Sequence, residues 1–314
     1  MAGTAVKPEQ VDTRVDLGGL ALRNPVLTAS GTFGYGTEFA PFFDLAQLGG
    51  FVAKSLTLLP RVGNPPPRIA EVPAGMLNAI SLENVGVEAF IGEKVPAIPE
   101  GVAIVASVFG HEIPDYAQVA RRLSEEPRIA AIEINASCPH VQSGGIEFGQ
   151  DPAVLAALVG AVREATTRPL FVKLSPNVTR IVEMARVCQE EGADAVCLIN
   201  TVQALDVDIE KRKPVLSNVL GGLSGPAIRP IALRMVWQVA RELQIPICGI
   251  GGIGSAEDAV KFLLCGATAV QVGTANYLNP MAPAEIAAGI AAYAARQGVS
   301  RVADLVGALE PSGA

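Results

Sequence analysis

Residues 170–199, LFVKLSPNVTRIVEMARVCQEEGADAVCLI, contain the repeating unit from which the fold is predicted. The stretch begins and ends with short apolar runs, 170–174 and 195–199, and between them 178–191 carries apolar residues at helical spacing. Near-continuous apolar runs are typical of parallel strands buried on both faces. The stretch therefore predicts a strand, a crossover helix and a second parallel strand.

The same unit recurs along the chain. The apolar runs are PVLTA (25–29), GFVAK (50–54), AIVAS (103–107), AAIEI (130–134), LFVKL (170–174), AVCLI (195–199), ICGIG (247–251) and AVQVG (269–273). The helical patterns cover 37–48, 84–96, 113–125, 151–166, 178–191, 227–243, 255–265 and 281–296. This alternation predicts an α/β fold, a (β/α)8 TIM barrel, with a doubly wound open sheet as the alternative.

Two connections, 55–83 and 200–226, are too long to be simple loops. Each begins where a predicted strand ends, which in a barrel is the carboxyl-terminal face where active sites lie. We therefore expect both long insertions to contribute to function.

Composition narrows the class of protein. The chain has 314 residues, 50% of them hydrophobic and 18% charged, with a net charge of −7, so a folded globular protein is expected and a nucleic-acid binder is not. The amino-terminal residues do not resemble a secretion signal, and no run approaches the ~20 apolar residues that span a membrane. A cytoplasmic protein is predicted.

The cysteines, at 138, 188, 197, 248 and 265, include no C-x-x-C pair, and the only histidines are His111 and His140. This pattern argues against disulfides and against an iron–sulfur cluster or zinc site held by this chain. No metal site is predicted.

In a barrel the residues that follow each strand share one cavity. They are Ser30, Lys54, Ser107, Asn135 with Cys138, Lys173, Asn200 with Thr201, Gly251 with Gly252, and Gly273 with Thr274. The glycine-rich loops GLSG (222–225), GIGGIG (249–254) and VGTAN (272–276) predict a phosphate cradle. Two other interpretations stay open: a dinucleotide fingerprint, which lacks its acidic residue ~20 positions on, and glycines that serve only close packing.

Three side chains in this set could be reactive. Lys54 and Lys173 could face a developing negative charge, form a Schiff base as in a phosphosugar lyase, or simply extend to the barrel rim. Cys138 could be a base or a nucleophile, because a thiolate is favoured beside a cation, or it could be an inert loop thiol. His140 is a possible partner or a residue of the rim.

Three long blocks resemble a known family. KSLTLLPRVGNPPPRIAEVPAGMLNAISLENVG (54–86) is similar to the dihydroorotate dehydrogenases. INASCPHVQSGGIEFGQDP (134–152) and IEKRKPVLSNVLGGLSGPAIRPIALRMV (209–236) resemble the NAD-linked class 1B catalytic subunit within it. The resemblance runs from about 14 to 298 and implies one FMN-binding barrel domain over 1–314, active in pyrimidine (UMP) synthesis.

The resemblance implies roles for particular residues. The FMN phosphate would lie on Gly225, Gly251, Gly252, Gly273 and Thr274, and its ring on Ser30, Lys54, Ser55, Ser107, Asn135, Lys173 and Ile199. Dihydroorotate or orotate would contact Lys54, Asn78, Ala79, Ile80, Ser81, Leu82, Asn135, Asn200 and Thr201. Cys138 would remove the C5 proton while the C6 hydride passes to FMN, and Lys54 and Lys173 would assist.

Three positions depart from the family pattern. Ser81 and Ser107 stand where the family commonly has Gly and Asn, and His140 stands where Asn usually follows Cys-Pro. Ser81 and His140 put details of substrate contact in doubt, and Ser107 puts one flavin hydrogen bond in doubt.

The resemblance also implies a partner. This chain has no cysteine cluster for electron transfer, so FAD and a [2Fe–2S] cluster are expected on a second subunit that reduces NAD. A heterotetramer built on a dimer of this chain is predicted. The alternatives are the fumarate-using homodimeric class of the same enzyme and a non-catalytic scaffold.

Overall fold

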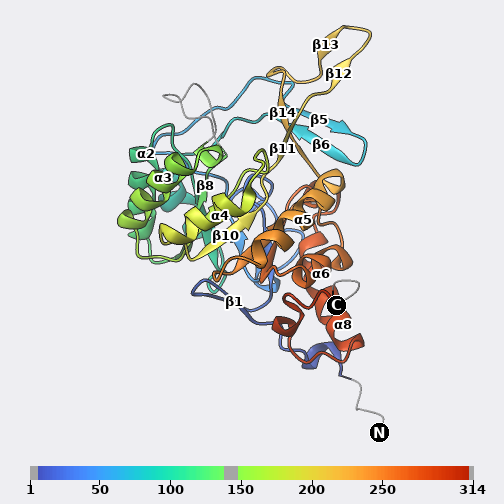
Figure 1. Cartoon of the computed structure of the whole chain (residues 1–314). Helices are drawn as coiled ribbons and strands as arrows, with labels where there is room; N and C mark the ends of the chain where they lie inside the picture. The colour runs from blue at the N-terminus through green and yellow to red at the C-terminus, as the bar shows by residue number, and fades with distance from the viewer. Residues whose placement is uncertain (1–5, 138–147, 311–314) are drawn as a thin grey trace.

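Eight parallel strands form the centre of the molecule, for which we describe residues 6–137 and 148–310 of a computed structural model (Figure 1). They are β3 (Val26–Thr28), β4 (Phe51–Val52), β7 (Ile104–Val108), β8 (Ile129–Asn135), β9 (Leu170–Lys173), β10 (Ala195–Leu198), β15 (Ile247–Ile250) and β16 (Ala269–Val272). Each of the eight apolar runs contributes one of these strands, as the sequence predicted.

The strand order is that of a barrel. The hydrogen-bonded order is β3-β16-β15-β10-β9-β8-β7-β4. From β4 to β16, each barrel strand therefore lies beside the barrel strand that follows it in the sequence. The barrel closes between β3 and the residues just before β4, where the Gly49 N–H donates to the Val26 carbonyl at 2.9 Å. The (β/α)8 barrel is confirmed and the open-sheet alternative is wrong, because the order never reverses.

Helices return the chain along the outside of the barrel. They are α2 (Ile113–Ser124), α3 (Pro152–Ala165), α4 (Ile181–Glu190), α5 (Arg229–Ala240), α6 (Ala256–Leu264) and α8 (Ala282–Arg296), together with the short α7 (Ala275–Leu278). The Asp151 carboxylate caps the start of α3, where it accepts the backbone amides of Ala153 and Val154. Short 3-10 turns lie at η1 (Pro8–Gln10), η6 (Phe148–Gln150), η7 (Pro226–Ile228) and η8 (Val302–Leu305).

Two predicted helices are wrong or broken. Over 37–48 the only helical element is the 3-10 turn η2 (Leu45–Gln47). Pro41 interrupts the predicted helix, and Asp44, in the middle of the predicted range, is the N-cap of η2. Over 84–96 the chain forms α1 (Val87–Ala89), the π-helical turn η3 (Phe90–Lys94) and the 3-10 turn η4 (Val95–Ala97). Gly92 and Pro96, both poor in helix interiors, lie in this segment.

An amino-terminal hairpin closes one end of the barrel. β1 (Val15–Leu17) pairs with β2 (Leu20–Leu22), and their inward side chains pack with Leu27 and Phe171 in the barrel interior. The sequence analysis did not predict this hairpin. A larger core lies between the strands and the surrounding helices.

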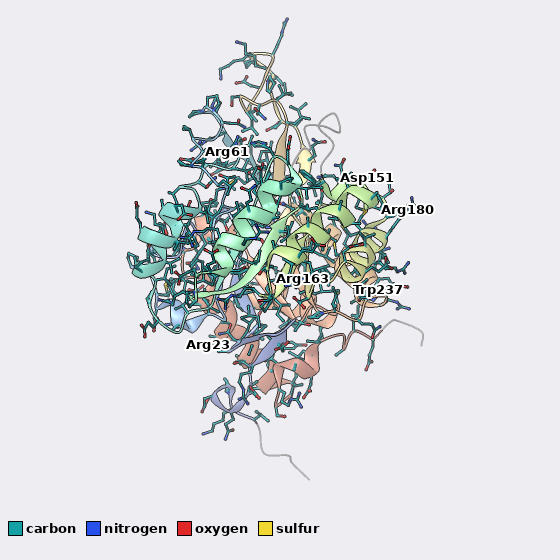
Figure 2. All side chains as sticks on the ribbon, turned by 90° about the vertical axis from the view of Figure 1, so that its left-hand side faces the viewer. Arg23, Arg61, Asp151, Arg163, Arg180 and Trp237 are labelled. Atoms are coloured by element: carbon teal, nitrogen blue, oxygen red, sulfur yellow. The ribbon has the colours of Figure 1, made fainter. Side chains whose placement is uncertain are left out.

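The other end of the barrel carries a small antiparallel sheet. Its order is β11-β14-β6-β5, from β11 (Val202–Ala204), β14 (Gly221–Ser224), β6 (Gly75–Asn78) and β5 (Ile69–Val72), and the hairpin β12 (Val207–Asp208) with β13 (Lys213–Pro214) projects beyond it (Figure 1). The two long insertions therefore join into one structure at the carboxyl ends of the strands. Arg61 lies at this end and Arg23 at the opposite one (Figure 2).

Within the described residues, none of the helices combines the length and the apolar character needed to cross a membrane.

Candidate active site

A cavity of about 630 Å³ opens at the carboxyl ends of the barrel strands, beneath the small sheet. Most predicted site residues line it, namely Ser30, Lys54, Ser55, Asn78, Ala79, Ile80, Ser81, Leu82, Asn135, Lys173, Ile199, Asn200, Thr201, Gly225, Gly251, Gly252, Gly273 and Thr274. The fold thus brings together residues from almost the whole length of the chain. Cys138 and His140 lie outside the described residues.

Ser107 does not line the cavity. Its side chain is fully buried, and its hydroxyl lies 2.8 Å from that of Ser55, which does face the cavity. Ser107 therefore lies behind Ser55 and does not form part of the cavity wall. The Ser107 side chain is too short to reach past Ser55 into the cavity. Its hydroxyl is placed to orient the hydroxyl of Ser55.

Lys54 is the second residue after β4, and its side chain lines the cavity. Burial lowers its pKa from 10.5 to about 8; the Glu83 carboxylate opposes this shift, and the positive charge of Lys173 adds to it. This lysine can lose or regain a proton near neutrality, and its charge is costly unless an anion lies beside it.

Lys173 is the last residue of β9 and is only 4% exposed. Its ammonium group donates to the Ser30 hydroxyl at 3.3 Å. Among the described residues, no carboxylate oxygen lies within 4.0 Å of the ammonium nitrogen of Lys54 or Lys173. One partly buried and one buried cation, neither with an acidic partner in the described part of the chain, make this cavity suited to an anionic ligand.

A chain of side-chain hydrogen bonds orients the two asparagines of the site. The Asn135 amide donates to the Ser55 hydroxyl at 3.3 Å, and the Asn200 amide donates to Asn135 Oδ1 at 3.3 Å. The Tyr116 hydroxyl holds the Asn135 carbonyl at 3.0 Å. The asparagines thus present fixed donors and acceptors, which suits a planar ligand with amide groups.

The glycine-rich half of the cavity has backbone geometry that only glycine adopts freely. Gly225, Gly251 and Gly252 have φ values of 93°, 127° and 73°. Gly225 precedes η7 and α5, and the hydroxyl of Thr274, just before α7, donates to that of Ser224 at 2.8 Å. Backbone amides at such helix starts favour a phosphate.

The loop after β6 forms the wall opposite the barrel floor. Asn78 donates its amide to the Gly222 carbonyl at 3.2 Å, which ties this loop to the second insertion. Ser81 and Leu82 have φ values of 57° and 60°, a conformation that is strained for residues with side chains. Glycine would adopt the conformation of Ser81 without strain.

The sequence analysis missed Asn177, which also lines the cavity. Its side chain donates to Ser175 at 3.0 Å and accepts the Gln203 amide at 2.9 Å, so it joins the loop after β9 to the second insertion. The signal was the pair of polar residues Ser175 and Asn177 just after the apolar run 170–174, which is the criterion that selected the other site residues.

Within the part of the chain that the structure describes, no three His, Cys, Asp or Glu side chains are grouped so as to hold a metal ion.

Comparison with known proteins identifies one family and a set of similar proteins that share a single name. The family described as Dihydroorotate dehydrogenase matches residues 13–293. A protein of Pelobacter propionicus named dihydroorotate dehydrogenase B (NAD(+)), catalytic subunit, is 58% identical over 300 residues, which cover 95% of this chain and 99% of that protein. Proteins of the same name from Trichlorobacter lovleyi and Geobacter sulfurreducens are 57% and 54% identical, over 94% and 96% of this chain and 98% and 99% of theirs.

Proposed function

The chain belongs to the dihydroorotate dehydrogenase family, and from this premise we propose that it is the catalytic subunit that oxidises dihydroorotate to orotate in pyrimidine biosynthesis. The observation that carries the proposal is one cavity that combines a glycine-rich wall with two lysines, the partly buried Lys54 and the buried Lys173, neither of which has an acidic partner among the described residues. A phosphate-bearing cofactor and an anionic substrate would satisfy both features.

FMN is the cofactor that fits these residues. Three glycines with positive φ and the starts of α5 and α7 leave room and backbone amides for a phosphate, and the cavity volume is in the usual ~300–1,000 Å³ range of cofactor sites. We assign the phosphate to Gly225, Gly251, Gly252, Gly273 and Thr274. We assign the ring to Ser30, Lys54, Ser55, Asn135, Lys173 and Ile199. When bound, FMN supplies the acceptor for the hydride of the substrate.

The substrate would lie between the asparagines and the loop after β6. The ammonium group of Lys54 is placed to attract the carboxylate of dihydroorotate, and Asn135 and Asn200 would pair with its planar amides. Residues 78–82 and Thr201 would complete the pocket. Such contacts orient the reacting carbons and exclude water.

Cys138 is our choice for the base, although it lies outside the described residues. It follows Asn135 by three residues, and Asn135 ends β8 at the cavity. The C5 proton of dihydroorotate lies alpha to a carbonyl, so its removal needs a positioned base. A thiol has a pKa closer to neutrality than a serine hydroxyl, which suits it to this task.

The electrons would leave through a partner. The relatives are named catalytic subunits of an NAD(+)-linked enzyme. We propose that this chain forms a dimer that binds an electron-transfer subunit carrying FAD and [2Fe–2S], giving a cytoplasmic heterotetramer. The 1–314 chain would form a single FMN-binding domain.

The test is an absorption spectrum of the purified chain before and after anaerobic addition of dihydroorotate. We expect a yellow protein whose visible flavin band bleaches. A colourless protein, or one trapped covalently on Lys54 or Lys173 by borohydride with a carbonyl substrate, would contradict the proposal. Rapid fumarate-dependent turnover by the chain alone would contradict the link to NAD.

A further inference from the structure

Glu133 is a buried carboxylate that the proposed reaction does not use. It lies in the middle of β8, is 0% exposed, and faces the barrel interior. Its Oε2 atom accepts a hydrogen bond from the Gln271 amide at 2.7 Å, whereas Oε1 of Glu133 and Oε1 of Gln271 have no hydrogen-bond partner among the described residues. No cation of the described residues lies within the ion-pair distance of 4.0 Å.

Stability does not explain this residue. Removing a carboxylate from water costs several kcal/mol, and one neutral amide partner returns only part of that cost. An apolar side chain of similar size would fill the barrel interior at lower cost, as Phe171 does on the neighbouring strand, where it pairs with Glu133. The reason for a carboxylate at this position is therefore sought in where Glu133 lies relative to the cavity.

Glu133 lies one side-chain layer beneath the candidate site. Side chains two residues apart on a strand point to the same face, so Glu133 lies beneath Asn135, the last residue of β8. Asn135 lines the cavity, and so does Gly273, which directly follows the strand that carries Gln271. The Gln271 amide also contacts the Cys197 sulfur at 3.7 Å, and Cys197 pairs with Lys173 across β10 and β9.

The negative charge of Glu133 and the positive charge of Lys173 both act on Cys197. Contact with Cys248 and burial raise the pKa of Cys197 well above its usual value, Glu133 adds to this rise, and Lys173 opposes it. The geometry agrees, since Glu133 lies only two residues before Asn135 on β8 and Asn135 lines the cavity. In a poorly solvated interior the field of such a charge is weakly screened.

We propose that the buried charge of Glu133 offsets the two lysines above it and lowers the reduction potential of the flavin bound in the cavity. This inference rests on the proposed FMN site. Lys54 and Lys173 favour the electron-rich reduced ring, and a carboxylate beneath it disfavours that state. A lower potential helps the onward transfer of electrons toward NAD. Glu133 does not touch the cavity and acts only through its charge.

The experiment measures FMN binding and the midpoint potential of bound FMN in the wild-type chain and in four variants: E133Q, E133D, E133M and E164Q. E133Q keeps the side-chain volume and removes the charge, so we expect a more positive potential with FMN still bound. E133D keeps the charge and should stay near the wild-type potential. E164Q removes an exposed carboxylate on α3, outside the barrel, and should leave the potential unchanged.

Two outcomes overturn the inference alone. One is an E133Q potential equal to that of a wild-type chain that binds FMN and is bleached by dihydroorotate. The other is loss of FMN binding by both E133Q and E133M, which would make Glu133 a structural residue. A wild-type chain that binds no FMN, or is not bleached, would instead overturn the proposed function and this inference with it.

Discussion

Lys54 shows how a single residue links the site to stability. Its pKa falls from 10.5 in the unfolded chain to about 8 in the fold, chiefly because it is buried. The unfolded state therefore holds more protons between these pH values, so stability rises with pH from about 8 to 10.5. Below pH 8 the buried charge opposes folding by at most about 3 kcal/mol.

Replacement of Lys54 by Met should remove this dependence. We expect Lys54→Met to raise the free energy of unfolding of the ligand-free chain at neutral pH by a few kcal/mol at most and to flatten its rise at alkaline pH. Urea unfolding at several pH values measures both effects. Lys213→Met, at an exposed lysine of β13, is the control and should leave the pH dependence unchanged. An unaltered pH profile in Lys54→Met would show that Lys54 is not the group responsible.

Cys138 is the residue on which the chemistry depends in our proposal. Cys138→Ala should slow the bleaching of bound flavin by dihydroorotate by about 10²–10⁴-fold, because general-base catalysis contributes that much. FMN affinity should not change. Stopped-flow absorbance of the FMN-loaded chain measures the bleaching rate. The rate of Cys138→Ser should fall between those of the wild type and Cys138→Ala. Bleaching at the wild-type rate in Cys138→Ala would refute the assignment of the base.

At the scale of elements, the glycines in the loops after β14, β15 and β16 serve two different purposes: some are needed for the loop to fold, and others leave space for a ligand. A Cβ atom on Gly225, at φ 93°, would lie 2.9 Å from Gly75 Cα, so alanine there strains the loop itself. A Cβ atom on Gly273 would meet only Ala29 Cβ at 3.5 Å and Thr32 Oγ1 at 4.0 Å, which is ordinary contact. Ala29 and Thr32 both line the cavity.

The two substitutions should therefore differ. Gly273→Ala should leave the unfolding free energy within about 1 kcal/mol of wild type while lowering FMN affinity at least about tenfold, or ~1.4 kcal/mol. Gly225→Ala should destabilise the ligand-free chain by about 1–3 kcal/mol. Urea unfolding and flavin fluorescence titration measure the two quantities. Unchanged FMN affinity in Gly273→Ala would exclude that loop from the phosphate site.

At the scale of the whole molecule, the barrel is closed at one end by a hairpin and open to ligand at the other. Leu17 of β1 is 0% exposed in the interior core, far along the barrel from the cavity. The elements that stabilise the barrel at its amino end are thus distinct from those that form the site. This separation resembles the usual division between the two faces of such barrels.

Leu17→Ala should test that division. We expect a loss of about 2–5 kcal/mol in unfolding free energy, since a buried leucine leaves a cavity, with FMN affinity unchanged in the folded chain. Leu309→Ala, at a 44% exposed leucine, should cost far less. Denaturant unfolding with a parallel FMN titration measures both. A large loss of FMN affinity in Leu17→Ala would show that the two ends are coupled.

Much of the fold and site could be predicted from local pattern. Continuous apolar runs identified all eight barrel strands because strands buried on both faces have no polar face to obscure them. Polar residues at the carboxyl ends of those strands identified Lys54, Asn135 and Lys173, because parallel strands place their carboxyl ends together. The helix predicted over 37–48 was wrong because apolar spacing alone does not register the interruption at Pro41.

The sequence by itself determined the barrel, the residue types gathered at its carboxyl rim and, through three long motifs, the family. Only the tertiary structure decided that segments 55–83 and 200–226 pair into one sheet, that the β1–β2 hairpin fills the opposite end, that Ser107 lies behind Ser55, and that Glu133 is buried beneath the site. The physical reason is that strand burial and strand-end position are local properties of the chain. Pairing between distant segments and the partners of a buried charge depend on which surfaces meet once the barrel closes.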